Sequence, residues 1–239
     1  MHEQDPSSTG TTTAAASPTT AITITTDADT TPARALYFAY GSNLSFTQMR
    51  MRCTHNPDLS SRPVAIARLD RWRWLICQPG YANVVPPAGL RVGRQIDEGS
   101  KVPVSGEEDT VYGVLYEMDA ADEALLDGYE GVDRRAPPSW QDGKVPRGVR
   151  PREQADGDYN KWYVSATVTE WLDEEQRRRW ENGSETTTVL VYVDEERVRV
   201  APPRAEYIPR MNRAMREAET IGFPKKWTDE VMRQFIPPN

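Results

Sequence analysis

Short apolar runs, separated by polar and turn-forming residues, indicate a fold built from short strands and helices. The apolar and aromatic runs predict strands at residues 35–40, 64–76, 110–117, 161–171 and 186–193. Apolar residues at helical spacing predict helices at residues 45–53, 119–128, 173–181, 204–221 and 226–235. Because short strands mix with helices at the edges, the pattern predicts an α+β fold rather than repeated βαβ units.

The most informative local signal is residues 37–44, which read Tyr-Phe-Ala-Tyr-Gly-Ser-Asn-Leu. The aromatic run suits a buried strand, and Gly41, Ser42 and Asn43 then favour a tight turn with positive φ. Ser45 can cap the helix that follows. A strand, a turn and a helix start in succession direct several backbone N–H groups toward one point, which suits an anion or a developing oxyanion. An ordinary strand-to-helix connection is the alternative.

A second signal lies at residues 119–132, where an apolar helix ends on a glutamate. Asp119 is a suitable N-cap for this helix. Gly128 and Gly131 lie on either side of Tyr129-Glu130, so the helix is expected to end there with Glu130 at its exit. This is an unusual position for a merely solvated charge. The alternative is a surface loop at the end of a helix.

The first 33 residues differ in composition from the rest of the chain. They are rich in Thr, Ala, Ser and Pro, and they carry four acids but no Lys or Arg. Such a segment buries too little apolar surface to offset the entropy of ordering, so we expect a disordered tail at 1–33 and a folded domain at 34–239. The tail lacks the features of a transit or signal peptide, and no apolar run reaches membrane-spanning length.

The charge pattern argues against nucleic-acid and membrane partners. The net charge is −7, of which the tail supplies four negative charges, so the remainder is nearly balanced. Arg71-Trp72-Arg73-Trp74 combines basic and aromatic residues as base-stacking surfaces do, but alternation with period two places both tryptophans on one face of a strand. We therefore interpret Trp72 and Trp74 as core residues.

Histidine and cysteine are scarce, which limits the possible chemistry. Only His2, His55, Cys53 and Cys77 are present, and the cysteines have no CxxC spacing. A histidine-rich metal site is impossible, no nucleophile elbow accompanies His55, and no phosphate-loop or dinucleotide fingerprint occurs. We expect reduced thiols, a cytoplasmic location, and no metal or cofactor.

Together, the two signals resemble the γ-glutamylcyclotransferase family, which pairs Tyr-Gly-Ser-Asn-Leu with Leu-Asp-x-x-Glu-Gly-Val. Here the two motifs are Tyr40 to Leu44 and residues 126–132. Further similar segments follow in the same order, at residues 67–69, 111–116, 202–207 and 222–224. The resemblance covers most of residues 35–239 and implies a small, mixed-strand β-barrel flanked by helices. The sequence departs from the family at residues 80–87 and in polar insertions at about 91–109 and 133–160.

The resemblance also implies a reaction. The α-amine of a small γ-glutamyl compound attacks its own γ-carbonyl, which releases 5-oxoproline and a free amine. The resemblance makes Glu130 the general acid/base and assigns substrate binding to the following residues: Tyr40, Gly41, Ser42, Asn43, Leu44, Asn83 and Tyr207. No metal takes part.

Two alternatives remain open at this point. One is a γ-glutamylamine cyclotransferase, which would use the same residues on an amine leaving group. The other is a non-catalytic interaction protein on the same fold, for which the insertions and the tail would be the evidence. The identity of the γ-glutamyl substrate is left open, and so is the choice between monomer and homodimer.

Overall fold

The computed structural model describes residues 35–87, 109–132, 158–180 and 184–238. The predicted tail lies outside the described residues, as do nearly all of the two predicted insertions. Within this part of the chain a closed barrel forms from β1 (Leu36–Ala39), β5 (Thr110–Tyr116), β2 (Pro63–Asp70), β6 (Asn160–Trp171) and β7 (Thr186–Val193), in that order around the barrel. The pairing of β1 with β7 is parallel and the others are antiparallel. The predicted α+β fold with a small mixed-strand barrel is confirmed.

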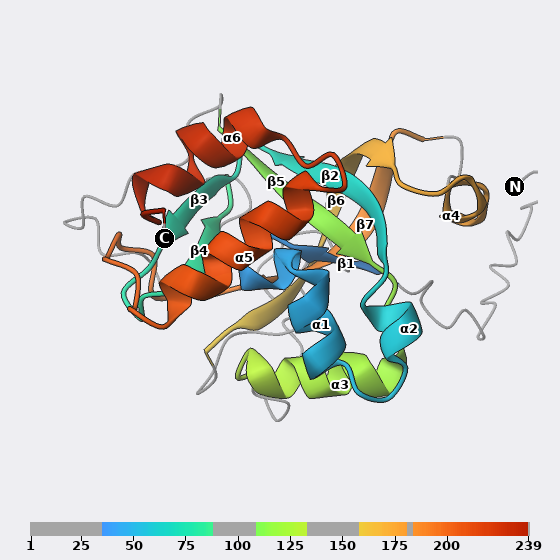
Figure 1. Ribbon diagram of the computed structural model, residues 1–239, viewed down its shortest axis with the longest axis horizontal. Helices are drawn as coiled ribbons and strands as arrows, with labels where there is room; N and C mark the ends of the chain where they lie inside the picture. Colours follow the sequence, from blue (N-terminus) through green and yellow to red (C-terminus); the bar gives the residue numbers. More distant parts are fainter. Residues whose placement is uncertain (1–34, 88–108, 133–157, 181–183, 239) are drawn as a thin grey trace, which may run out of the picture. The chain divides into compact units, whose positions relative to one another are not determined.

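Helices flank the barrel (Figure 1). The first group follows β1 and consists of a 3-10 turn η1 (Ser42–Leu44), α1 (Phe46–Arg52) and α2 (Pro57–Ser60). The others are α3 (Ala120–Tyr129), α4 (Glu174–Trp180), α5 (Tyr207–Glu219), α6 (Lys225–Glu230) and a 3-10 turn η3 (Met232–Gln234). Helix α1 contacts both α3 and α5, which brings two segments far apart in the sequence to the loop after β1 (Figure 1). None of the described helices has the length and apolar character needed to cross a bilayer.

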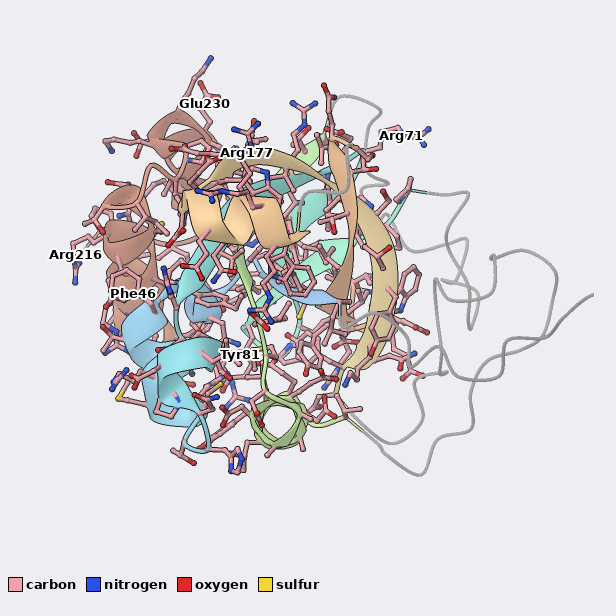
Figure 2. The ribbon with its side chains drawn as sticks, turned by 90° about the vertical axis from the view of Figure 1, so that its right-hand side faces the viewer. Phe46, Arg71, Tyr81, Arg177, Arg216 and Glu230 are labelled. Carbon is pink, nitrogen blue, oxygen red and sulfur yellow. The ribbon has the colours of Figure 1, made fainter. Side chains whose placement is uncertain are left out.

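The predicted strand at 64–76 is interrupted, and this is the main error in the predicted elements. Strand β2 ends at Asp70, and a turn at Arg71 leads into β3 (Arg73–Ile76), which pairs with β4 (Ala82–Val85) in a separate two-stranded sheet. Arg71 has a φ of 67°, a left-handed conformation that no strand residue adopts. Its side chain projects from the surface (Figure 2). The apolar pattern continues through the turn, so periodicity alone gave no sign of the break.

Both tryptophans of this segment belong to the core, as predicted. Trp72 and Trp74 are each 3% exposed. Trp72 packs edge-to-face on Trp162 of β6, with ring centroids 5.9 Å apart. The indole N–H of Trp74 donates to the carbonyl of Tyr40 at 2.9 Å, which ties β3 to the end of β1. A buried indole needs such a partner, and this bond also fixes the point where the chain leaves the barrel.

Two predicted helices are also shorter than expected. Helix α5 begins at Tyr207 rather than at residue 204, and the helix expected at 226–235 is divided into α6 and η3. Strand β4 and helix α2 were not predicted, because each has only four residues and shows little periodicity. The remaining described elements lie within a residue or two of their predicted positions, which is the usual uncertainty at element ends.

Candidate functional site

A cavity of about 380 Å³ opens where the loop after β1 meets the end of α3, the start of β6 and the start of α5. Six residues that the sequence singled out line it: Tyr40, Gly41, Ser42, Asn43, Glu130 and Tyr207. The chain therefore brings both motifs and the predicted tyrosine to one concave site. A concave site with a few convergent polar groups is the usual setting for a small-molecule ligand.

Two predicted binding residues lie elsewhere. Asn83 is fully buried, and its amide group is engaged with the backbone of Asp194 in both directions, at 2.9 and 3.1 Å. It joins β4 to the end of β7 and does not line the cavity. Leu44 is also fully buried, and its backbone N–H, the group expected to contact substrate, donates instead to the carbonyl of Gly41 at 2.9 Å. The expected contacts of Asn83 and Leu44 with substrate do not fit these positions.

The Gly-Ser-Asn turn differs in conformation from the prediction. Residues 42–44 form a 3-10 turn, Gly41 has a φ of −117°, and none of residues 41–43 has a positive φ. Ser45 caps α1 as predicted, because its hydroxyl accepts the N–H of Gln48 at 3.0 Å. Within the turn, the N–H of Ser42 donates to the Tyr207 hydroxyl and that of Leu44 to the carbonyl of Gly41. The N–H groups of Gly41 and Asn43 are the remaining candidates for an anion.

Glu130 is held at the cavity by the end of α3. It is the C-cap of this helix, and the next residue, Gly131, adopts a φ of 64° that an L side chain would strain. The N–H of Val132 returns to the carbonyl of Asp127 at 2.9 Å, the reversal that commonly terminates a helix. The glycine predicted to end the helix therefore also turns the chain so that Glu130 faces the cavity.

Asn43 connects the two motifs. Its amide N–H₂ group donates to Oε1 of Glu130 at 3.1 Å and to the hydroxyl of Tyr37 at 2.9 Å. Its amide oxygen accepts from Gln48 at 2.8 Å and from Arg52 at 3.1 Å. Because only the oxygen of an amide can accept from these donors, the orientation of the Asn43 side chain is fixed with its nitrogen toward Glu130.

Glu130 has a partly buried carboxylate, with its side chain 18% exposed, and only one of the two oxygens accepts hydrogen bonds from the protein. Oε1 accepts from Asn43 and also from Arg52 at 3.0 Å, whereas Oε2 has no hydrogen-bond partner among the described residues. Burial raises the pKa of Glu130 above its ordinary value, and the charge of Arg52 and the Asn43 hydrogen bond partly oppose this rise. A carboxylate with a raised pKa and a free oxygen is better suited than an ordinary glutamate to accept and return a proton.

Two hydroxyls at the cavity are arranged as donors. The Tyr207 oxygen accepts the N–H of Ser42 at 3.2 Å and that of Ala82 at 3.4 Å. The Ser42 oxygen accepts from Gln48 at 2.8 Å and from Arg210 at 2.9 Å. Protein donors occupy the acceptor sites of both oxygens, so each O–H is left to donate to a ligand. Burial raises the pKa of Tyr207 to about 12, which keeps its proton in place.

Other tyrosines at the cavity are committed to the protein. The hydroxyl of Tyr40 donates to the carbonyl of Tyr192 at 2.6 Å, and that of Tyr192 donates to Asp127 at 2.7 Å. The hydroxyl of Tyr159 donates to the carbonyl of Ala82 at 2.9 Å. These rings form walls of the cavity while their hydroxyls hold the barrel, β4 and α3 together. Tyr40 therefore lines the site, as predicted, but its hydroxyl serves the fold.

Four arginines of the cavity were not predicted from the sequence: Arg52, Arg197, Arg204 and Arg210. One of them had a detectable signal, since Arg210 follows Tyr207 by three residues and thus shares its helix face. Its guanidinium lies 5.2 Å from the centre of the Tyr207 ring. Among the described residues, no group of three or more His, Cys, Asp and Glu side chains is placed to hold a metal ion.

Comparison with known proteins identifies the fold. No protein-family model and no curated protein sequence matches the chain. The crystal structure of YkqA from Bacillus subtilis is similar, with a TM-score of 0.51 and 15% identity over 86% of this chain. This chain spans 56% of that longer one. Two solution structures from Arabidopsis thaliana are more distant, each with a TM-score of 0.35. At5g39720.1 is 16% identical over 82% of this chain and 92% of its own length. At3g28950.1 is 15% identical over 83% of this chain and 86% of its own length.

At this level of identity the similarity to YkqA concerns the fold alone. The barrel and its flanking helices are those of the γ-glutamylcyclotransferase-like fold, so the resemblance seen in the sequence is confirmed for the fold. A fold of this kind does not specify an activity, which has to be argued from the site.

Proposed function

We propose that the protein is a γ-glutamylcyclotransferase that releases 5-oxoproline from a γ-glutamyl compound. The observation that carries the proposal is the pairing of Glu130, with its raised pKa and free Oε2, with the donor hydroxyls of Ser42 and Tyr207 in one cavity. The site thus offers a base and two hydrogen-bond donors. A reaction whose nucleophile is already part of the substrate needs these groups and few others.

The cyclisation begins with the substrate's α-ammonium group beside Glu130. Oε2 accepts a proton from it, and the resulting amine attacks the γ-carbonyl carbon to form the C–N bond of a five-membered ring. Because the amine and the carbonyl belong to one molecule, folding the glutamyl chain back is what the protein has to provide. The Tyr207 hydroxyl donates to the oxygen that becomes negatively charged in this step.

The second half of the reaction breaks the original amide. As the γ-carbonyl re-forms, the bond to the leaving amine breaks and Glu130 returns its proton to that nitrogen. The ring nitrogen then gives its second proton to the Glu130 carboxylate, which passes it to the released amine. The products are 5-oxoproline and the protonated free amine, and the carboxylate of Glu130 is regenerated. Atoms and charges balance without water, metal or cofactor.

The α-carboxylate of the substrate fits the side of the cavity occupied by Arg210. The Arg210 guanidinium donates to Ser42 at 2.9 Å and to Gln48 at 3.1 Å, which holds it in place, and it forms no ion pair with a carboxylate among the described residues. With the Ser42 hydroxyl it offers a charge-assisted site for one carboxylate. This contact would place the neighbouring α-amine toward Glu130.

Incubation with a panel of γ-glutamyl compounds tests the proposal, with 5-oxoproline detected by mass spectrometry. The panel includes γ-glutamyl amino acids, glutathione and γ-glutamyl amines. Stoichiometric 5-oxoproline and free amine from at least one member would support the proposal. No 5-oxoproline from any member would contradict it and would favour a non-catalytic interaction protein.

A further inference from the structure

The arginines and acids that line the cavity are unequal in number, with four arginines against Glu130 and Asp158. Arg52 pairs with Glu130 at 3.0 Å, and Arg197 pairs with Asp158 at 2.7 Å. The other two, Arg204 and Arg210, form no ion pair among the described residues. The charge of Arg210 acts on Glu130 from a greater distance, and the Glu206 carboxylate near Arg204 accepts from the Tyr81 hydroxyl at 2.9 Å. If a substrate α-carboxylate takes Arg210, a second positive charge at the cavity is still available.

The structure holds Arg204 in place. Its Nε donates to the carbonyl of Pro79 at 2.8 Å, its backbone N–H donates to that of Gly80 at 3.1 Å, and its guanidinium lies 5.2 Å from the centre of the Tyr81 ring. Gly80 has a φ of 85°, and a Cβ there would lie 2.7 Å from Cγ of Arg204. The absence of a side chain at Gly80 therefore makes room for the Arg204 stem.

This arrangement leaves the two terminal nitrogens of Arg204 without a hydrogen-bond partner among the described residues. A guanidinium already held by its Nε and by an aromatic ring loses little further freedom when it binds a planar carboxylate. The two terminal nitrogens of Arg204 are thus available to bind an anion, although the residue as a whole is exposed.

Aromatic rings separate Arg204 from the reacting groups. Tyr81 stands edge-on to Tyr207, with ring centroids 5.1 Å apart, and Arg204 lies over Tyr81. Arg210 instead lies over the Tyr207 ring itself and bonds to Ser42. In the proposed reaction the γ-carbonyl lies at the Tyr207 hydroxyl. The glutamyl part of the substrate then extends toward Arg210. The leaving group extends in the other direction, toward Tyr81 and Arg204.

We propose that Arg204 is a specificity residue that binds a carboxylate on the leaving amine, so that γ-glutamyl amino acids and peptides are preferred over γ-glutamyl derivatives of uncharged or cationic amines. This inference rests on the proposed cyclotransferase function. It favours a γ-glutamylcyclotransferase that acts on amino acid derivatives over the γ-glutamylamine cyclotransferase that the sequence also left open.

A matched pair of substrates tests the inference. γ-Glutamyl-alanine and γ-glutamyl-alaninamide have almost the same size and differ by one negative charge on the leaving group. A partly exposed charge-assisted pair is worth on the order of tenfold in kcat/KM, so the full-length protein should prefer γ-glutamyl-alanine by about that factor. Arg204→Gln should abolish the preference, mainly by raising KM for γ-glutamyl-alanine, and Arg204→Lys should retain part of it.

Arg216→Gln is the matched control. Arg216 lies on α5 and projects away from the domain (Figure 2), so its replacement changes the net charge equally without altering the cavity. This variant should keep the preference of the unmodified protein. If the ratio of kcat/KM for γ-glutamyl-alanine to that for γ-glutamyl-alaninamide is the same in Arg204→Gln, in Arg216→Gln and in the unmodified protein, Arg204 does not select the leaving group.

Binding of the two compounds to the Glu130→Gln variant separates this inference from the proposed function. Calorimetry on that variant measures affinity without turnover. A preference for γ-glutamyl-alanine that disappears with Arg204→Gln supports the carboxylate subsite even if the protein forms no 5-oxoproline. Equal affinity for the two compounds overturns the subsite, whether or not 5-oxoproline is formed.

Discussion

The amide nitrogen of Asn43 donates to Oε1 of Glu130 at 3.1 Å, although the two residues lie 87 positions apart in the sequence. This bond joins the loop after β1 to the end of α3. Each side chain therefore helps to orient the other: Asn43 orients the carboxylate of Glu130, and Glu130 accepts one of the two amide hydrogens of Asn43. The structure therefore favours a positioning role for Asn43, where the sequence suggested direct substrate contact.

Replacement of Asn43 should impair turnover through Glu130. In Asn43→Ala, Oε1 keeps only Arg52, and the carboxylate loses the bond that sets its direction. A hydrogen bond to a charged group is worth about 1.5–3 kcal/mol, so we expect kcat to fall by roughly 10–100-fold. Steady-state kinetics with a γ-glutamyl substrate measures this loss. A KM effect with unchanged kcat would instead indicate a direct substrate contact.

The pH profile should reveal the contribution of Arg52. Burial raises the pKa of Glu130 and Arg52 lowers it again, so removing the cation in Arg52→Gln should raise this pKa further. The base must be deprotonated to act, and the acidic limb of kcat/KM should therefore move to higher pH. Arg52→Lys, which keeps the charge, should leave the limb near its original position. An acidic limb that stays in place in Arg52→Gln would show that Glu130 does not set it.

Tyr207 and Tyr159 form a matched pair of tyrosines. Both line the cavity, but Tyr207 has its O–H free for a ligand, whereas Tyr159 donates to the carbonyl of Ala82. Tyr207→Phe should lower kcat by about 10²–10³-fold, the typical value of one oxyanion donor. Tyr159→Phe should mainly lower the melting temperature, because the carbonyl of Ala82 loses its partner. Similar kinetic losses in both variants would argue against a specific role for Tyr207.

How far the sequence predicts the molecule can be seen from particular residues. Tyr37 to Leu44, Asp119 and Gly131 carry local signals, and these predicted the neighbouring elements and the position of Glu130 at the end of its helix. They did not predict the 3-10 conformation of the Gly-Ser-Asn turn. The turn at Arg71 and the strand β4 depend on tertiary packing, and the continuous apolar pattern concealed them. Arg204 is similar: a contact with Pro79 that spans 125 positions holds its side chain at the cavity, and no local signal shows such a contact.

The insertion at 133–160 has its described ends at the cavity. The N–H of Asp158 donates to the carbonyl of Gly131 at 2.8 Å, and Glu130, Asp158 and Tyr159 all line the site. Because the ends lie side by side, a short Gly-Ser linker can replace residues 135–157. We expect the shortened protein to form 5-oxoproline with a changed preference among γ-glutamyl leaving groups. Identical substrate profiles, measured by competition on one mixed panel, would show that the segment has no part in selection.

Glu130→Gln should also affect stability in a predictable direction. A folded-state pKa above the unfolded value means that the stability contributed by Glu130 is present at low pH and lost as the pH rises through the folded pKa. Above the folded pKa of Glu130, the neutral glutamine avoids the cost of a partly buried charge and retains an acceptor for Asn43. Thermal melts should therefore show a melting temperature at pH 7 no lower than that of the unmodified protein. A clear decrease would mean that the ion pair with Arg52 outweighs burial.

The rate of 5-oxoproline formation by Glu130→Gln tests the central claim most directly. The substitution preserves the size and hydrogen-bonding geometry of the side chain but removes its capacity to accept a proton. General acid–base catalysis contributes about 10²–10⁴-fold, so kcat should fall by that factor while calorimetry shows that a γ-glutamyl substrate still binds. If the folded variant forms 5-oxoproline within a few-fold of the original rate, Glu130 is not the general acid/base and the proposed mechanism is wrong.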